Sequence, residues 1–373
     1  MASPAKPKRR KRSPLFRLLK VLYIILVVLS MLIVVSYAAF RLWIKPPAVE
    51  EQVVFTPDPQ SSAATDPETD PSAPTQSENT PLVLTRREGV YTCLLVGVAD
   101  MGGSDTIMLG TFDTNNKTAT LISIPRDTLV LRNGYNSKIN ATYSSGGVDL
   151  VRETVSDMLG IPIDFYVSIN LKAFQAIVDE IGGVWFDIPY HLDYDDPYQD
   201  LHIHFEPGYQ YLNGEDAMKV MRWRKNNEGS PYGNPGGGSD ISRIEMRNDF
   251  LKAVLSQTLQ LKNVTKIGEL SRLFGENVKS DLTIENLFWF GSQAILGGLA
   301  VEDVNFVVMP FRSVGESGIY YYRVYPDQQP LLELINQSLN PFVDEVTLDE
   351  LDLISVSADG NTLSSSTGVL ADP

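Results

Sequence analysis

Arginine and aspartate residues stand at the ends of predicted strands and helices in this sequence. Arg126 follows the apolar run LISI (residues 121–124) and Pro125, and Asp127 comes next. Proline removes a backbone donor and ends the strand, which holds the guanidinium at the strand terminus. Two interpretations stay open at this point: a polar loop after a buried strand, or an arginine placed there to bind an anion.

Two more arginine groups occur further along the chain. Arg222 and Arg224 flank Trp223, and Arg243 and Arg247 are one helical turn apart near the start of a predicted helix. Cations in a first helical turn are unfavourable by ~0.3–1 kcal/mol each, and like charges at this spacing add a few tenths. The arrangement becomes favourable when an anion binds, because helix N–H groups and guanidinium groups converge on it.

The same helix start also admits a plain structural interpretation. Asp240 or Ser239 is a natural N-cap after the glycine-rich loop GNPGGGS. Arg243 would then be a solvated surface charge paired with Glu245 or Asp240.

Carboxylates accompany these arginines. Asp100 and Asp105 lie in the segment GVADMGGSDT, and Lys138 and Asn140 lie in SKINATY. Carboxylates beside arginines suggest a Mg²⁺ ion shared with phosphate oxygens. Each aspartate alone is more often a cap or turn residue.

The cysteine and histidine content argues against other metal chemistry. The single cysteine, Cys93, lies in the apolar stretch YTCLLVGV, which predicts a buried structural thiol. His202 and His204 would share one face of a strand, but no cysteine or further histidine cluster accompanies them. The sequence therefore does not favour a zinc site there.

The N-terminal region predicts a membrane anchor. Residues 1–43 contain nine Lys/Arg and no Asp/Glu. After the basic segment 1–20, residues 21–43 include twenty uncharged residues, enough to span roughly 30 Å of hydrocarbon. The basic residues before the span predict a cytoplasmic N-terminus and an extracytoplasmic remainder. A cleaved signal peptide is the alternative, since Ser36, Tyr37 and Ala38 resemble a cleavage site.

Composition divides the remaining chain. Residues 44–85 are rich in Pro, Ser and Thr and predict a disordered linker, and residues 341–373 predict a C-terminal tail. Outside residues 1–43 the chain has 22 basic and 46 acidic residues. This acidic balance predicts no nucleic-acid partner.

Residues 86–340 alternate between strand and helix patterns. The turn at Asn115 and Asn116 predicts a hairpin between two of the strands. The interleaving predicts an α/β fold with a mixed central β-sheet flanked by helices, in an α/β/α arrangement. The strands are expected at 91–98, 106–113, 118–124, 165–170, 184–188 and 304–310, and the helices at 148–160, 171–183, 213–224, 240–261 and 283–298.

Several segments together resemble the LytR-CpsA-Psr family of membrane-anchored cell-wall transferases. The similarity covers roughly residues 90–310 and rests on segments with consistent order and spacing: LLVGVADMGGSDTIML, LISIPRDTLV, KINATYSSGG, LGIPIDFYVSIN, FQAIVDEIGGV, LNGEDAMKVMRWRK and SDISRIEMRNDFLKAV. The resemblance implies a Mg²⁺-dependent phosphotransferase at the cytoplasmic membrane. It would move a glycopolymer, such as teichoic acid, capsule or another glycan, from a polyprenyl-pyrophosphate carrier to peptidoglycan.

The resemblance also assigns roles to residues. It places Asp105 and Asp240 at acidic positions linked to Mg²⁺ and catalysis. The expected metal ligands are Asp105 and Asp100, and the expected catalytic residues are Asp105, Arg126 and Asp240. The pyrophosphate would be bound by Arg126, Lys138, Arg222, Arg224, Arg243 and Arg247. An apolar tunnel between sheet and helices would hold the polyprenyl chain, lined by Phe165, Phe174, Ile177, Phe250 and Leu251.

The chain departs from the family pattern at two motifs. The first family motif is usually Gly-x-Asp, but Ala99 stands at the aspartate position of this chain, with Asp100 next to it. Gly103 stands where an arginine is usual. In the helix motif Arg247 replaces a common glutamine, and Met246 a frequent arginine. We hypothesise that Arg247 restores the missing positive charge.

Two other functions fit the same residues. The site could hydrolyse the lipid-linked pyrophosphate with water, or the chain could be a non-catalytic envelope protein that binds or regulates.

Overall fold

The computed structural model describes residues 44–55, 82–98, 102–132, 135–228, 240–316, 319–323, 328–356, 362–365 and 368–371, and nine positions between 23 and 35. Contacts divide the chain into two units, Met1–Pro47 and Ala48–Pro373. In the first unit the nine described positions between 23 and 35 are helical and exposed, and residues 44–47 have no regular secondary structure. Within the described residues, no helix has the length and apolar character needed to cross a membrane. The predicted segments 1–20 and 21–43 fall mostly outside the described residues.

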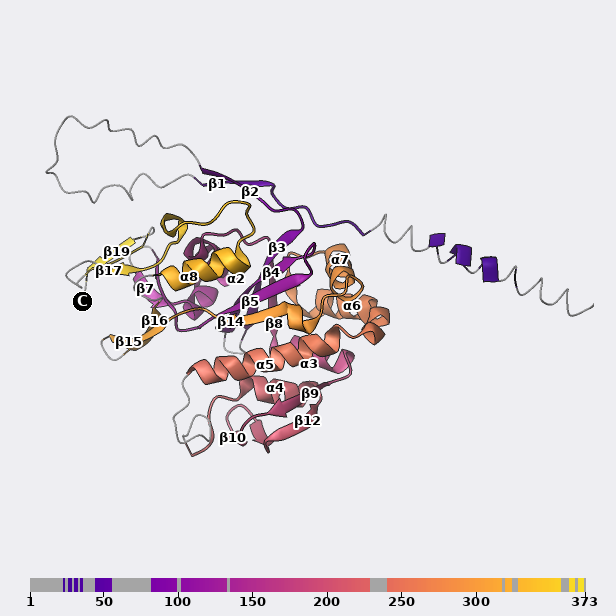
Figure 1. Cartoon of the computed structure of the whole chain (residues 1–373). Helices are drawn as coiled ribbons and strands as arrows, with labels where there is room; N and C mark the ends of the chain where they lie inside the picture. Colours follow the sequence, from indigo (N-terminus) through magenta and orange to yellow (C-terminus); the bar gives the residue numbers. More distant parts are fainter. Residues whose placement is uncertain are drawn as a thin grey trace, which may run out of the picture. The chain divides into compact units, whose positions relative to one another are not determined.

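A six-stranded mixed sheet forms the centre of the second unit (Figure 1). Its order is β13 (Lys279–Ser280), β8 (Phe165–Asn170), β3 (Val90–Val98), β4 (Ser104–Asp113), β5 (Thr118–Ile124) and β14 (Val304–Val308). The β3–β8 and β5–β14 pairs are parallel, whereas β13–β8, β3–β4 and β4–β5 are antiparallel. The predicted mixed sheet and the predicted hairpin between β4 and β5 are therefore confirmed.

Alternation along the strands gives the sheet two buried faces. Leu94 and Val96 of β3 join one apolar cluster with residues of α2 (Asn140–Leu159) and α8 (Gln329–Leu334). Cys93 and Leu95 point the other way, toward α3 (Leu171–Glu180) and α6 (Ile267–Asn277). Because successive side chains of a strand face opposite sides, one apolar strand supplies both layers.

Helix α2 starts earlier than the sequence predicts but ends where expected. It contains non-helical backbone at Gly146 and Gly147, which mark a kink. It ends at Gly160 in the left-handed conformation (φ 65°), which glycine adopts without a Cβ penalty. A Cβ at Gly160 would also lie 2.8 Å from the backbone oxygen of Glu350.

A second apolar cluster lies beside the sheet. It packs α4 (Gly214–Arg222) and α5 (Asp240–Thr258) against two ribbons, β9–β12 (Val184–Ile188 with Gly208–Leu212) and β10–β11 (Leu192–Asp196 with Leu201–Phe205). Trp223 and Phe250 are fully buried in it. The strands β10, β11 and β12 of these ribbons were not predicted, because their short alternating runs carry many polar residues.

The remaining described elements are short, apart from α7. They are β1 (Gln52–Phe55), β2 (Leu82–Thr85), β6 (Leu129–Arg132), β7 (Tyr135–Lys138), η1 (Leu261–Lys266), α7 (Ile284–Ile295), η2 (Val301–Asp303), β15 (Arg312–Glu316), β16 (Ile319–Arg323), η3 (Ile335–Leu339), η4 (Leu348–Glu350), β17 (Ser355–Val356), β18 (Thr362–Ser365) and β19 (Gly368–Ala371).

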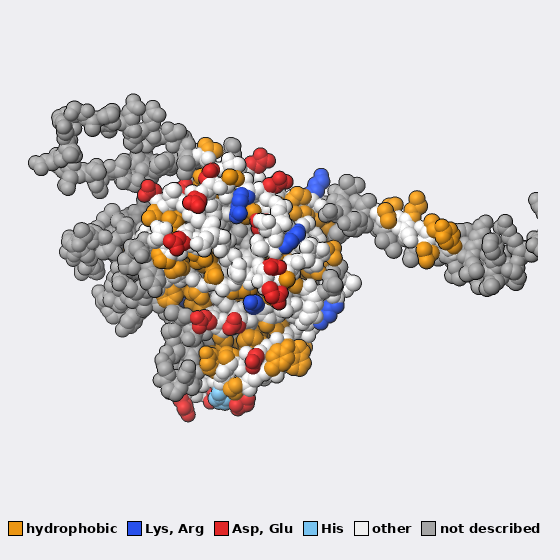
Figure 2. All heavy atoms as spheres, in the orientation of Figure 1, with side chains coloured by type: hydrophobic (Ala, Val, Ile, Leu, Met, Phe, Trp, Pro, Cys, Tyr) orange, Lys and Arg blue, Asp and Glu red, His pale blue; other side chains and the backbone are white. Residues whose placement is uncertain are grey.

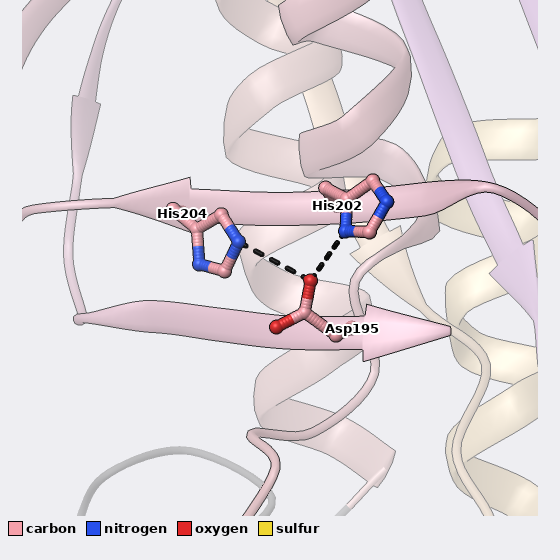
Figure 3. Close-up of side chains that lie close together, drawn as sticks. All are labelled: Asp195, His202 and His204. Carbon is pink, nitrogen blue, oxygen red and sulfur yellow. Dashed lines mark hydrogen bonds and ion pairs between the residues drawn. The ribbon is translucent and has the colours of Figure 1, made fainter. Parts of the chain in front are cut away.

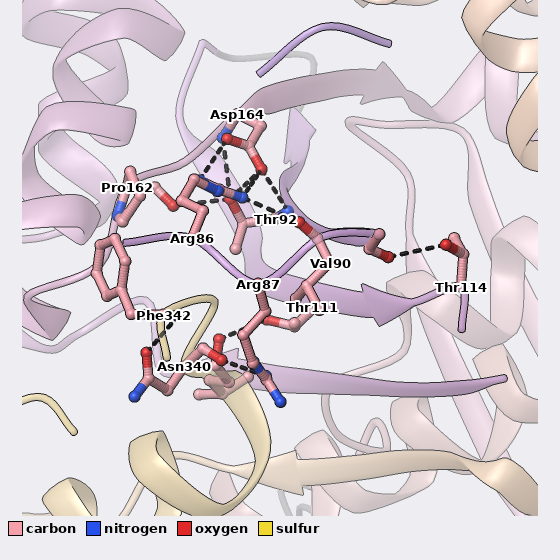
Figure 4. Close-up of polar contacts among 12 residues, drawn as sticks. Arg86, Arg87, Val90, Thr92, Thr111, Thr114, Pro162, Asp164, Asn340 and Phe342 are labelled. Atoms are coloured by element: carbon pink, nitrogen blue, oxygen red, sulfur yellow. Dashed lines mark hydrogen bonds and ion pairs between the residues drawn. The ribbon is translucent and has the colours of Figure 1, made fainter. Parts of the chain in front are cut away.

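A buried ion pair fixes the start of β3 to the sheet. Arg86 donates to both oxygens of Asp164 (2.8 and 2.6 Å), and the same carboxylate accepts from the Thr92 backbone (2.8 Å; Figure 4). Both charged side chains are less than a tenth exposed. The guanidinium also donates to the backbone oxygen of Val90 at 3.0 Å. The two-point geometry between guanidinium and carboxylate fixes the orientation of both side chains.

Parts of the predicted linker and of the predicted tail form ordered structure. Residues 52–55 and 82–85, placed in the disordered linker, form the antiparallel pair β1–β2, and Leu84 is buried. Residues expected in the tail pack into the main cluster: Phe342, Val346, Leu351 and Leu353. The Val343 N–H donates to the Thr85 carbonyl at 2.9 Å, which joins the two regions. Their apolar residues are too sparse in sequence to predict burial without the partner segment.

Candidate functional site

Asp105 and Arg126 meet because β4 and β5 are paired. The antiparallel register places Ile107 opposite Ile124, so Asp105 and Arg126, each two positions beyond that pair, lie on the same face at the same end. Arg126 Nη1 donates to Asp105 Oδ1 at 2.8 Å. The guanidinium after Pro125 therefore points at a carboxylate of the neighbouring strand.

Arg224 reaches the same carboxylate from a loop. Its Nη2 donates to Asp105 Oδ2 at 2.8 Å. Helix α4 ends at Arg222, and the next residue, Trp223, is fully buried with its indole N–H donating to Asn226 Oδ1 at 3.0 Å. This anchor fixes the loop so that Arg224 extends outward beside β4. Both oxygens of Asp105 are thus bonded to guanidinium groups.

Arg247 adds a third guanidinium from α5. Its Nε and Nη2 donate to the backbone oxygen of Met221 at 3.1 and 2.9 Å, near the C-terminus of α4. The preceding Met246 is buried in the second cluster, which fixes the orientation of this part of α5. Arg247 and Asp105 line the same pocket.

The arginines keep Asp105 ionised. Burial alone would raise the pKa of its carboxyl, but Arg224 and the hydrogen-bonded Arg126 outweigh burial and, with Arg247, lower the pKa below its usual value. Opposite charges nearby favour the charged form. Asp105 is therefore an anion at neutral pH and a weak proton acceptor.

A pocket of about 470 Å³, counted with its open mouth, extends from this charged group. Its polar end carries the Asp105 carboxylate and the guanidinium groups, and its wall is mostly apolar. Within the wall Ser123 donates to Asn248 Oδ1 at 2.8 Å. The lining residues are Asp105, Thr106, Ile107, Met108, Ser123, Ile124, Pro125, Arg126, Ile244, Arg247, Asn248 and Leu251.

Such a pocket is suited to a ligand with an anionic group and an apolar part. Arginine forks bind phosphate oxygens at two points, and the apolar wall favours hydrocarbon over water.

Lys138 belongs to a neighbouring ion pair. Its Nζ lies 3.2 Å from Asp127 Oδ1, and the Nε of Arg126 lies 3.9 Å from the same oxygen. The backbone N–H of Asn140, at the start of α2, donates to the Arg126 carbonyl at 3.2 Å. Asp127 therefore forms a long ion pair with Arg126, and Lys138 joins the group through the same carboxylate.

The other predicted site residues are not brought to Asp105 in the described part of the chain. Arg222 donates to the side-chain oxygen of Gln199 at 2.5 Å instead. Asp100 lies outside the described residues. The side chains of Asp240 and Arg243 also lie outside them, although helix α5 begins at Asp240.

The expected lipid-lining residues divide into two groups. Leu251 lines the pocket. Phe250 is fully buried and packs edge-on against Phe174 and an aromatic ring of β9. Phe165 packs against an aromatic ring of α7, and Ile177 packs in the cluster between the sheet and α6. Phe165 and Phe250 are buried, and Phe174 and Ile177 are partly buried against the two clusters, so of the five expected residues only Leu251 lines the described pocket.

Asp105 fits a role as a Mg²⁺ ligand. Mg²⁺ prefers hard oxygen ligands and is usually held by one or two protein carboxylates together with substrate phosphates. Asp105 is ionised and stands beside the guanidinium groups of Arg126, Arg224 and Arg247. It is the one predicted metal ligand whose side chain the structure describes.

Sequence reasoning missed most of the pocket wall. Ser123, Asn248 and Ile244 were not singled out, although each lies next to a residue that was considered. If Arg126 and Arg247 had been assumed to face each other, helix periodicity would have identified Ile244 of α5 as a further residue on the facing side. Only the packing of α5 beside the sheet edge makes the two arginines neighbours.

Comparison with known proteins connects this geometry to a family. The model of the LytR_cpsA_psr family matches residues 58–338. A Bacillus subtilis protein named polyisoprenyl-teichoic acid–peptidoglycan teichoic acid transferase TagV is 30% identical over 275 residues, which cover 70% of this chain and 67% of the relative.

Two solved structures are also similar. The crystal structure of B. subtilis TagV has a TM-score of 0.55 at 27% identity, covering 66% of this chain and 97% of that one. A structure of TagT bound to LIIa-WTA has a TM-score of 0.53 at 27% identity, covering 68% and 91%.

Proposed function

Because this chain belongs to the LytR-CpsA-Psr family, we propose that it is a membrane-anchored phosphotransferase that moves a glycopolymer from a polyprenyl-pyrophosphate carrier to peptidoglycan. Its similarity to proteins named as teichoic acid transferases supports this substrate class. So does its likeness to TagT, which has been solved bound to LIIa-WTA. The geometry at Asp105 is the observation that carries the proposal.

The charge of the site matches a diphosphate. Arg126, Arg224 and Arg247 with Asp105 carry a formal charge of +2, and a pyrophosphate esterified at both ends carries about two negative charges at neutral pH. Arginine cannot lose its proton at any relevant pH, so this attraction does not depend on pH. Phosphoryl transfer relies mainly on such positioning and charge neutralisation.

In the proposed reaction a sugar hydroxyl of peptidoglycan attacks the phosphorus attached to the glycopolymer. A new phosphorus–oxygen bond forms, the bond to the bridging oxygen breaks, and polyprenyl phosphate leaves. Arg126 and Arg224 would hold the phosphates in line and neutralise the leaving group. The apolar wall beyond them would take the first isoprene units, with Leu251 and Ile244 in contact.

A carboxylate must take the hydroxyl proton, and Asp105 and Asp240 are the two candidates. The lowered pKa of Asp105 favours a role in orienting the arginines and, with substrate phosphates, in holding Mg²⁺. Bound there, Mg²⁺ would supply further neutralisation of phosphate charge. Asp240 begins α5, the helix that carries Arg247.

The N-terminal sequence supports a proposal for the location of the chain. We propose that residues 21–43 anchor the chain in the cytoplasmic membrane, with residues 1–20 in the cytoplasm and the catalytic unit outside. The described positions in that segment are helical with exposed apolar side chains, which is compatible with contact with lipid.

The purified full-length chain with a lipid-linked glycopolymer donor tests the proposal. With Mg²⁺ and peptidoglycan present, we expect labelled polymer to become covalently attached to peptidoglycan and polyprenyl phosphate to be released. Release of free polymer at the same rate with and without acceptor would establish hydrolysis instead. Donor binding without turnover under any of these conditions would establish a non-catalytic binding protein.

A further inference from the structure

A cluster of two histidines and aspartates lies on the exposed face of the β10–β11 ribbon, and none of its residues lines the Asp105 pocket. The antiparallel register places Asp195 opposite His202 and Asp193 opposite His204. All four side chains are on one face, because positions two apart on a strand share a face. Figure 3 shows both imidazoles directed at the Asp195 carboxylate. A histidine reaches the surface near β10 in the space-filling view (Figure 2).

The distances suit a small cation. Asp195 Oδ1 lies 2.5 Å from His202 Nδ1 and 3.3 Å from His204 Nε2. One ligand atom from each of the three residues lies within 4.8 Å of the other two. Ligand atoms bound tetrahedrally to zinc at ~2.0–2.2 Å are separated by roughly 3.3–3.5 Å. Small side-chain rotations would therefore bring the three atoms to coordination distance.

Each imidazole also has a second carboxylate at its other nitrogen. His204 Nδ1 lies 2.8 Å from Asp193 Oδ1, and His202 Nε2 lies 3.7 Å from Asp200 Oδ1. A histidine that binds metal usually donates its remaining N–H to a carboxylate, which fixes the tautomer and orients the ring. With His204 Nε2 as the metal ligand, His204 Nδ1–H can donate to Asp193. With His202 Nδ1 as the metal ligand, His202 Nε2–H faces Asp200.

Hydrogen bonds fix the ribbon beneath the cluster. The backbone N–H groups of Asp193 and Asp195 donate to the side-chain oxygens of Asn226 and Asn227 at 3.0 and 2.9 Å. The amide of Asn227 also lies 3.4 Å from Asp195 Oδ2. Asn226 is buried and accepts from the Trp223 indole. The metal-facing side chains therefore project from a backbone that is held in place.

We propose that His202 Nδ1, His204 Nε2 and the Asp195 carboxylate form a binding site for a divalent transition metal of the zinc class. Two imidazoles and a carboxylate are donors that zinc accepts, and three protein ligands leave a position open for water or an outside ligand. The proton now between His202 Nδ1 and Asp195 would move to His202 Nε2, beside Asp200. The sequence placed both histidines on one strand face but did not favour a zinc site, because the third ligand, Asp195, comes from the paired strand.

Metal titration of the purified full-length chain, made without a polyhistidine tag, tests the site. We expect one Zn²⁺ per chain by isothermal titration calorimetry in excess Mg²⁺. We expect Co²⁺ in its place to give the visible absorption of a four-coordinate centre. His204→Ala should weaken Zn²⁺ binding more than Asp193→Asn, whose loss should be about 10–100-fold.

His191→Ala is the matched control. His191 is the one histidine of the chain that is not part of the cluster, and it pairs with Glu206. Its removal should therefore leave Zn²⁺ affinity unchanged. Because all of these side chains are exposed, far-ultraviolet circular dichroism should show the same fold for each variant. The proposal is overturned if the wild-type chain fails to bind Zn²⁺ in excess Mg²⁺, or if His204→Ala binds it as tightly as His191→Ala does.

Discussion

Arg224 donates to Asp105 Oδ2 at 2.8 Å although the two residues are 119 positions apart in the chain. The other oxygen of Asp105 accepts from Arg126, so one carboxylate holds two guanidinium groups at the mouth of an apolar pocket. A phosphate group would meet both arginines already oriented. Preorganised donors of this kind require little rearrangement when charge develops in a reaction.

Removal of either arginine should impair transfer. We expect Arg126→Ala and Arg224→Ala each to lower kcat/KM for the lipid-linked donor by roughly 100–1,000-fold, the usual effect of deleting one preorganised charge-stabilising donor. Arg272→Ala is the control, because Arg272 is exposed and pairs only locally with Glu269 and Glu276 among its described contacts. Equal activity of Arg126→Ala and Arg272→Ala would contradict the proposed site.

Arg247 should contribute to binding of the pyrophosphate. Arg247→Gln keeps a polar side chain but removes the charge, so we expect polyprenyl pyrophosphate to bind about tenfold more weakly, as for a lost charge-assisted contact. Affinity is measured by titration of the full-length chain. Because Arg247 also bonds to the Met221 carbonyl, the melting temperature is compared, and Arg152→Gln on α2 controls for loss of a surface charge. An unchanged affinity would remove Arg247 from the site.

The lowered pKa of Asp105 predicts a particular pH dependence of stability. The ionised form is favoured in the folded chain, so its contribution is fully present above the unfolded pKa of about 3.9 and is lost as pH falls through the lower folded pKa. The difference in melting temperature between wild type and Asp105→Asn should be constant from about pH 7 to 5 and should shrink below about pH 4.

Asp216 provides a control of opposite sign. Burial raises the pKa of its carboxyl, so its ionisation opposes folding as pH rises through the range between the unfolded and folded values. The melting temperature of Asp216→Asn should therefore increase relative to that of the wild type as pH rises through this range. If the melting-temperature difference from wild type changed with pH in the same way for Asp105→Asn and Asp216→Asn, the opposite directions of the two pKa shifts would be contradicted.

The buried Arg86–Asp164 pair should be costly to break. Asp164→Ala leaves the guanidinium buried without its charge partner and should lower the free energy of unfolding by about 3–5 kcal/mol. Asp149→Ala, which removes an exposed partner of Arg152, should cost about 1 kcal/mol or less. Chemical denaturation measures both. The double variant Arg86→Met/Asp164→Leu should recover much of the loss, because no buried charge remains unpaired.

Cys93 should be inert in the folded chain. Burial raises the pKa of its thiol to about 12, so the reactive thiolate is scarce at neutral pH. We expect negligible modification by iodoacetamide at pH 8 in native conditions and full modification in denaturant, measured by mass spectrometry. Rapid native alkylation would show that the thiol is accessible and is not a packing residue.

The sequence alone determined the local features of this protein. The apolar runs of β3, β4 and β5, the turn between β4 and β5, and the helix ends at glycine follow from side-chain periodicity and backbone preference. Motif order and spacing indicated the family, and Pro125 indicated that Arg126 ends a strand. These properties depend on neighbours within a few positions, which a sequence displays directly.

Only the tertiary structure decided which charged residues meet. It paired Arg224 with Asp105 but Arg222 with Gln199, although the two arginines are two positions apart. It buried Phe342 and Val346 in the core and brought Asp195 to two histidines of the opposite strand. Such contacts depend on strand register and on how elements distant in sequence pack, because a side chain's partners are set by spatial position and not by its neighbours along the chain.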